Sequence, residues 1–174
     1  MLRRGLMLMA ASALVMAAAT PAQAVWRLDP NDASVDRYDI AASSLTVVRS
    51  EGVRWMTVTI RTYEAYKIRE GEGWFKLRLD TWGAGKADFE MTMFGDPASG
   101  GATYAPIGSL HGTWGNYARI DKVGPRTLKA WFPVHWVHPN KAVRWYLRAL
   151  VPGPVWGPET TSEDRAPNAG WYGV

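Results

Sequence analysis

Four aspartates near the start of the chain have the residue type and spacing that could hold a metal ion. Asp29, Asp32, Asp36 and Asp39 all lie within the segment LDPNDASVDRYDI. Carboxylates this close repel one another unless a cation or a basic partner lies among them. A structural calcium ion is one solution, and solvent exposure of the loop is the energetically cheaper one. Asp164, near the C-terminus, is expected to join this group if the two termini lie side by side.

Two further aspartates lie in the segment DTWGAGKADF, a pattern that is typical of a hairpin tip. Asp80 closes one expected strand, two glycines allow a tight loop, and Asp88 opens the next strand. Calcium takes six to eight oxygen ligands, but Trp82 and Ala84 occupy positions where a calcium loop would supply a side-chain oxygen. The pattern therefore favours a hairpin with polar ends over a second calcium site.

Ten tryptophans are the other unusual feature of this composition. Aromatic faces stack on the apolar faces of sugar rings, so exposed tryptophans on a β-sheet would suit carbohydrate binding. The alternative is that the rings pack against long loops and the C-terminal segment, because tryptophan buries a large area. The tryptophans expected at outward or loop positions are Trp55, Trp74, Trp82, Trp114 and Trp131.

Residues that could support catalysis are few. The chain has no cysteine, and His135 and His138 would fall on opposite faces of an extended segment, which is a weak zinc signal. Asp88 and Glu90 would share one face of a strand, but a glycosidase needs two carboxyl groups across a cleft. Solvated strand charges explain this pair equally well, so we predict that the protein is not an enzyme.

The elements that must position these residues are β-strands. Period-two alternation dominates from Tyr38 to Val151, and no segment has a sustained helical period. The clearest runs are 53–63, 74–80, 86–94 and 143–151, with further strands expected at 38–48, 117–120 and 127–132. The side chains expected to face inward are Met56, Val58, Ile60, Phe75, Leu77, Leu79, Ala87, Phe89, Met91, Met93, Trp145, Leu147 and Ala149.

About eight short strands separated by Gly- and Pro-containing turns predict an all-β fold. We expect an antiparallel β-sandwich of the jelly-roll type. Residues 152–174 are rich in Pro and Gly and have no period. They are predicted to form an extended tail that packs on the domain through Trp156, Trp171 and Tyr172.

The first 24 residues indicate export. Arg3 and Arg4 precede the apolar run Leu6–Ala19, and Ala22-Gln23-Ala24 is a signal-peptidase pattern. We predict a cleaved signal peptide over 1–24, a single secreted domain over 25–174, and no membrane span in the mature form. Removal of Arg3 and Arg4 lowers the formal charge from +4 to +2. Because the charges are interspersed, we do not expect nucleic acid as a partner.

Three motifs occur in an order that resembles a known group of exported domains. They are Asp39-Ile40 after the acidic segment, the hairpin from Leu79 through Phe89, and the tail Asp164 through Gly170. In this order they are similar to family 9 carbohydrate-binding modules and DOMON-like domains. The resemblance implies a β-sandwich, calcium near the termini or loops in many members, and sugar binding in some.

These features together predict a secreted, non-enzymatic binding module. Its expected ligand is an extracellular or envelope carbohydrate, with a structural calcium ion near residues 29–39. The alternative is a cell-surface protein-interaction or scaffold domain that does not bind sugar.

Overall fold

The computed structural model describes residues 25–31, 38–66, 73–93, 103–112, 114–139, 142–151 and 162–173. The expected signal peptide and Trp156 lie outside these ranges. In the described part, regular structure is almost entirely strand, with one short 3-10 helix, η2 (Val134–Trp136). The strands are β1 (Arg27–Leu28), β2 (Ile40–Ser50), β3 (Val53–Thr62), β4 (Trp74–Asp80), β5 (Phe89–Met93), β6 (Thr103–Ser109), β7 (Trp114–Gly124), β8 (Thr127–Pro133), β9 (Arg144–Val151), β10 (Ser162–Ala166) and β11 (Tyr172–Gly173).

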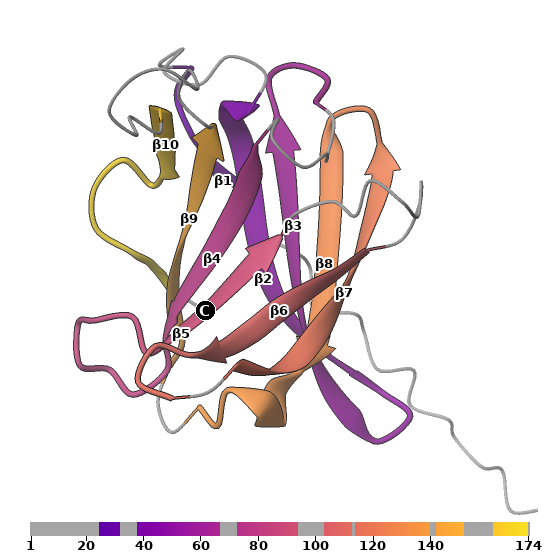
Figure 1. Ribbon diagram of the computed structural model, residues 1–174, viewed down its shortest axis with the longest axis vertical. Coiled ribbons are helices and arrows are strands. Elements are labelled where there is room, and N and C mark those ends of the chain that lie inside the picture. Colours follow the sequence, from indigo (N-terminus) through magenta and orange to yellow (C-terminus); the bar gives the residue numbers. More distant parts are fainter. Residues whose placement is uncertain are drawn as a thin grey trace, which may run out of the picture.

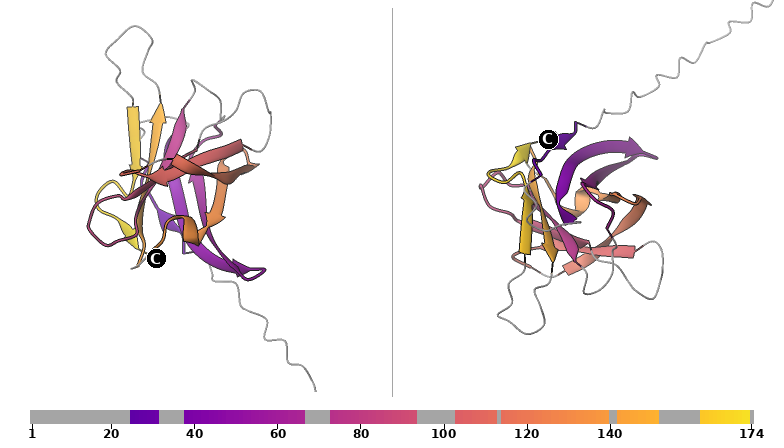
Figure 2. Two further views of the ribbon diagram at one scale, coloured as in Figure 1. Left: turned by 60° about the horizontal axis from the view of Figure 1, so that its bottom comes forward. Right: turned by 90° about the horizontal axis from the view of Figure 1, so that it is seen from above.

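All of these strands belong to one antiparallel sheet. The order is β1-β2-β3-β8-β7-β6-β5-β4-β9-β10, and β11 pairs with β9. Strands β4 to β8 form a meander that separates β3 from β9 (Figure 1). Seen from above, the strands surround a common interior (Figure 2), and β10 approaches β2. The prediction of an all-β, sandwich-like antiparallel fold is confirmed.

The interior is built from one side of each strand, as alternation requires. Met56, Val58 and Ile60 are buried on β3, and the same face of β4 and β9 contributes Leu77 and Leu147. The predicted inward positions on β3, β4, β5 and β9 are therefore confirmed. Turns Glu51-Gly52 and Pro125-Arg126 join β2 to β3 and β7 to β8.

The C-terminal segment packs on the domain as predicted, through β-pairing as well as aromatic contacts. Strand β10 pairs with β9 along five residues, and β11 pairs Tyr172 with Trp145. The Tyr172 ring lies 4.8 Å from the Trp145 ring, and the Trp171 ring lies 4.7 Å from the Tyr146 ring. Sequence alternation did not indicate these two strands, because both are short and flanked by Pro or Gly.

The solvated strand charges expected at Asp88 and Glu90 are not observed, because both side chains are buried. Tyr146 alternates with the inward residues Trp145 and Leu147 of β9, yet it is also buried, because the Trp171 ring and the Arg165 guanidinium pack on it. Among the described residues, no helix has the length and apolarity needed to cross a membrane.

Candidate functional site: the β4–β5 loop and the outer face of β4, β9 and β10

Asp80, at the end of β4, organises the middle of the β4–β5 loop (residues 81–88). Its buried carboxylate accepts hydrogen bonds from the backbone N–H groups of Gly83, Ala84 and Gly85 at 2.6, 3.1 and 2.9 Å. It also accepts a hydrogen bond from the Arg144 guanidinium. Burial alone would raise the pKa of Asp80, but these donors outweigh it and hold the pKa below its ordinary value.

Asp88 organises the start of the same loop from the opposite side. Its carboxylate accepts from the backbone N–H of Thr81 and of Trp82, each at 3.0 Å, and from the Thr81 hydroxyl at 3.1 Å. Five consecutive backbone amides, from 81 to 85, therefore donate to two buried carboxylates. Gly83 and Gly85 have φ of 73° and 79°, which lets the chain turn tightly around Asp80. The loop conformation is fixed by its own two aspartates.

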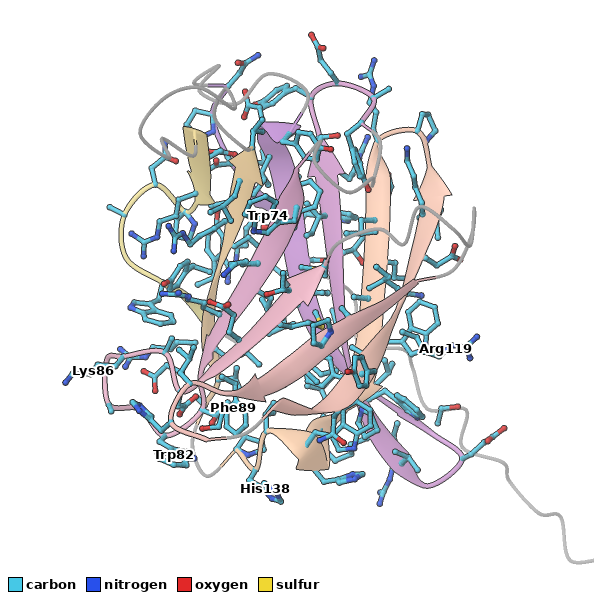
Figure 3. All side chains as sticks on the ribbon, in the orientation of Figure 1. Trp74, Trp82, Lys86, Phe89, Arg119 and His138 are labelled. Atoms are coloured by element: carbon cyan, nitrogen blue, oxygen red, sulfur yellow. The ribbon has the colours of Figure 1, made fainter. Side chains whose placement is uncertain are left out.

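This fixed loop presents an aromatic ring to solvent. Trp82 is 48% exposed, although its backbone N–H is held by Asp88. Trp82 and Lys86 lie at the periphery of the molecule, whereas Arg119 lies on the opposite side (Figure 3). A large apolar ring on a preorganised loop can bind a ligand at a small cost in conformational entropy.

Next to the loop, Glu90 holds two cations on the outer face of β4. Its carboxylate accepts from Lys76 Nζ at 2.9 Å and from Arg78 Nε at 2.7 Å. Burial acts to raise the pKa of Glu90, but the two cations outweigh it and keep the pKa below its ordinary value. Arg78 also donates to the Tyr146 hydroxyl at 3.2 Å. The network links β5, β4 and β9.

Cations and aromatic rings continue across β9 and β10. Arg148 lies opposite Lys76 on one side and Arg165 on the other. The Arg165 guanidinium lies 4.3 Å from the centre of the Tyr146 ring, and the Arg144 guanidinium lies 5.8 Å from that of Trp171. The outer face of β4, β9 and β10 is therefore a surface of cations interleaved with aromatic rings.

The other tryptophans predicted to bind ligand lie elsewhere. Trp55 on β3 and Trp131 on β8 are both half-buried. Trp131 lies opposite Thr57, which is two residues from Trp55 on the same face of β3, so the two tryptophans are diagonal neighbours. Trp74 is half-buried at the start of β4, a full strand length from Trp82 (Figure 3). Trp114 begins β7, but its side chain lies outside the described residues. Trp55 and Trp131 thus form a second aromatic surface, flanked by Arg119 and Lys129, whose cations lie 5.4 and 5.8 Å from the Trp131 ring.

Three of the five predicted metal ligands are described and buried: Asp29, Asp39 and Asp164. Asp164 reaches the N-terminal segment, where its Oδ2 accepts from the backbone N–H of Ile40 at 2.7 Å. Burial raises the pKa of Tyr172, and the nearby charges of Asp29 and Asp164 raise it further, with Arg27 opposing them. Asp32 and Asp36 lie outside the described residues. In the described ranges, no three acidic, cysteine or histidine side chains are arranged to hold a metal ion.

Sequence reasoning identified Trp82 but not the cationic surface beside it. Lys76, Arg78, Arg144 and Arg148 alternate with the predicted inward side chains of the runs 74–80 and 143–151, which is the signal that the sequence offered. What it did not show is that β4 pairs with β9, which brings residues about 70 positions apart into register.

Comparison of the chain with models of protein families gives no match. Comparisons with curated proteins and with solved structures give no match either. The resemblance to family 9 carbohydrate-binding modules and DOMON-like domains therefore stays a prediction, and the functional argument depends on the geometry of the surfaces described above.

Proposed function

We propose that the protein is a secreted, non-enzymatic module that binds extracellular or envelope carbohydrate. The single observation that carries this proposal is Trp82, an indole 48% exposed on a loop whose five consecutive amides are bound by two buried carboxylates. An indole offers an apolar face for a sugar ring and an N–H donor for a hydroxyl group. Because the loop is already ordered, ligand contact does not have to order it.

Polar groups for sugar hydroxyls lie close to the same loop. Arg144 contacts Asp80 at the loop base, and Lys86 lies on the loop itself. Trp55 and Trp131 supply a second aromatic surface on β3 and β8, which would suit a second contact with a long polymer. Export with loss of residues 1–24 belongs to this proposal, because such polymers lie outside the cytoplasm.

The test is binding to a panel of polysaccharides by affinity electrophoresis, followed by calorimetry on the best ligand. Trp82→Ala should weaken binding about 30-fold, which corresponds to about 2 kcal/mol for an anchor residue. Trp82→Phe should recover part of the affinity because it restores an aromatic face. The matched control is Tyr117→Ala, which removes a 65% exposed aromatic ring on β7.

Equal loss in the Trp82 and Tyr117 variants would contradict the assignment of the loop. Failure to bind any polysaccharide, together with a protein partner that is lost with Trp82→Ala, would instead support the protein-interaction alternative. Both variants should keep the melting temperature of the wild-type chain, because exposed substitutions usually change stability by less than about 0.5 kcal/mol.

A further inference from the structure

We propose that two copies of this protein associate by pairing the free edges of their β2 strands into one continuous antiparallel sheet. The inference goes beyond the proposed function and does not depend on it. One edge of β2 pairs with β3 up to the hairpin turn. On the other edge, β1 pairs with Ala42 and Ser43 only. Among the strands of the described chain, none pairs with the remainder of this edge, from residue 44 to residue 50.

The backbone groups of Val47 and Arg49 point toward this free edge. The Asp29 N–H donates to the Ala41 carbonyl at 3.1 Å, so Ala41 faces the β1 side. Alternate residues of an antiparallel strand direct their N–H and C=O groups to the same side, and the pairing of β2 with β3 has no register shift after Ala42. The odd-numbered residues up to 49 therefore face the free edge, and the even-numbered residues face β3.

The turn end of the β2–β3 hairpin extends beyond the body of the sheet (Figures 1 and 2). Strand β8 pairs with β3 only as far as Trp55, so residues 49–54 lie past the end of β8. Arg49 and Ser50 are exposed, and Val47 and Val48 are half-buried. A strand from another molecule can therefore reach this edge without displacing any strand of the described chain.

Strand β2 lacks the features that protect a free edge in most sheets. Natural proteins shield such edges with charged side chains, with proline or by keeping the edge strand very short. The segment from Ile40 to Val48, IAASSLTVV, contains no charged residue, no proline and no glycine. In contrast, β10 at the other end of the sheet order has the sequence SEDRA, and β1 is only two residues long. The long edge of β2 is thus open to pairing.

A second copy fits this edge because the hydrogen-bonding pattern is self-complementary. With a two-fold axis at Val48, Val47 of each copy lies opposite Arg49 of the other copy. Both residues face the edge, so each such pair can exchange both of its N–H···O bonds. No arginine then lies directly opposite an arginine, a placement that would be destabilising. Two-fold dimers of this isologous kind are the commonest symmetric assemblies.

The same register joins the apolar outer faces of the two hairpins. Val48 lies opposite Trp55 within one hairpin, and both side chains are half-buried. Pairing at the axis places Trp55 and Val48 of one copy in a row with Val48 and Trp55 of the other, at strand spacings of about 4.8 Å. The row lies on one side of the joined sheet, because the axis is perpendicular to the sheet. Association therefore covers apolar side chains that a single copy leaves partly exposed.

The first test is sedimentation equilibrium of the protein in its naturally processed form, from about 1 μM to about 1 mM, a range that spans weak affinities. The average mass should rise from that of a monomer toward that of a dimer. Val48→Lys should weaken association at least about tenfold, because lysine on an edge strand opposes pairing. The control is Val123→Lys, the same substitution at a 55% exposed position on β7, which should associate like the wild-type chain.

A second measurement tests the register without adding charge. The chain has no cysteine, so a single introduced thiol reports only contacts between copies. In the proposed pairing the two Cα atoms of residue 48 are about 4.5 Å apart, within the range of a disulfide. Those of residue 46 are about 14 Å apart, because they are offset by four residues along the strands. With oxidised glutathione, Val48→Cys should form a linked dimer, whereas Thr46→Cys, half-buried on the same face, should stay monomeric.

A monomeric mass at every concentration would overturn the inference. Equal weakening by the two lysine substitutions would do the same, and so would equal cross-linking of the two cysteine variants, which random collision produces. The carbohydrate proposal is tested separately, because Trp82 lies on the β4–β5 loop. Trp82→Ala should leave the average mass unchanged, and loss of association in this variant would place the contact on the loop instead of the β2 edge.

Discussion

Asp80 and Asp88 show how a buried carboxylate can shape a loop instead of performing chemistry. The two residues are buried at opposite ends of the β4–β5 loop. Asp80 accepts hydrogen bonds from three backbone N–H groups and from Arg144, and Asp88 accepts from two backbone N–H groups and from the Thr81 hydroxyl. Hydrogen bonds to a charged acceptor are stronger than those between neutral groups. The loop that presents Trp82 is therefore held by interactions that an amphipathic sequence pattern does not reveal.

Removal of the Asp88 carboxylate should loosen this loop and destabilise the protein. Asp88→Ala leaves the Thr81 and Trp82 N–H groups without their acceptor, and each buried unsatisfied donor costs about 1–3 kcal/mol. We expect the free energy of unfolding to fall by about 3 kcal/mol in urea titrations. Asp121→Ala, at an exposed position on β7, is the control and should change it by less than about 0.5 kcal/mol. An unchanged urea midpoint for Asp88→Ala would show that the loop does not depend on this carboxylate.

At the scale of elements, the C-terminal segment completes the β9 side of the sheet. Strands β10 and β11 both pair antiparallel with β9, and β11 continues along β9 in the same direction as β10. Trp171 and Tyr172 then contact Tyr146 and Trp145, which are neighbours in sequence on opposite faces of β9. The last residues of the described chain thus help to bury both faces of one strand.

Loss of the Tyr172 ring should therefore destabilise the fold and not only the tail. Tyr172→Ala removes a half-buried ring that packs on the core tryptophan Trp145, and we expect a loss of about 2 kcal/mol in the free energy of unfolding. Tyr117→Ala removes the same side chain from an exposed position and serves as the control. If both variants unfold at the same urea concentration, the tail does not contribute to stability.

At the scale of the whole molecule, the two ends of the sheet order meet. Strand β10 approaches β2, and the Asp164 carboxylate accepts the backbone N–H of Ile40 across this junction. Asp29 and Asp39 are also buried beside β2. Within the part of the chain that is described, these three carboxylates are not grouped as a metal site, and the other two predicted ligands, Asp32 and Asp36, lie outside that part.

The calcium prediction is tested by melting the protein with excess calcium and with chelator. A site filled at 100 times its Kd raises the free energy of unfolding by about 2.7 kcal/mol, because only the folded chain binds the ion. We expect calcium to raise the melting temperature and Asp164→Asn to reduce that rise. Magnesium, which requires a smaller octahedral site, is the control. An identical melting temperature in calcium and in chelator would remove the ion from the description of this protein.

Much of the architecture could be predicted from local sequence. The limits of β4 at Trp74 and Asp80 agree with the predicted range, and the buried face of β3 follows its alternation. The β6 strand was not anticipated, because Pro106 and Gly108 interrupt its pattern. The short strands of the tail were missed for a similar reason. Alternation is a local signal, and it fails where Pro or Gly occupies the strand.

The sequence by itself determined which side chains turn inward, because the pleat of a strand assigns successive residues to opposite faces. Only the tertiary structure decided which outward side chains become neighbours. Lys76, Arg148 and Arg165 share a row because β4, β9 and β10 pair in one register, and Asp164 reaches Ile40 because the sheet curls until its ends meet. Pairing between distant strands follows from how the whole chain buries its apolar faces, so no local pattern encodes it.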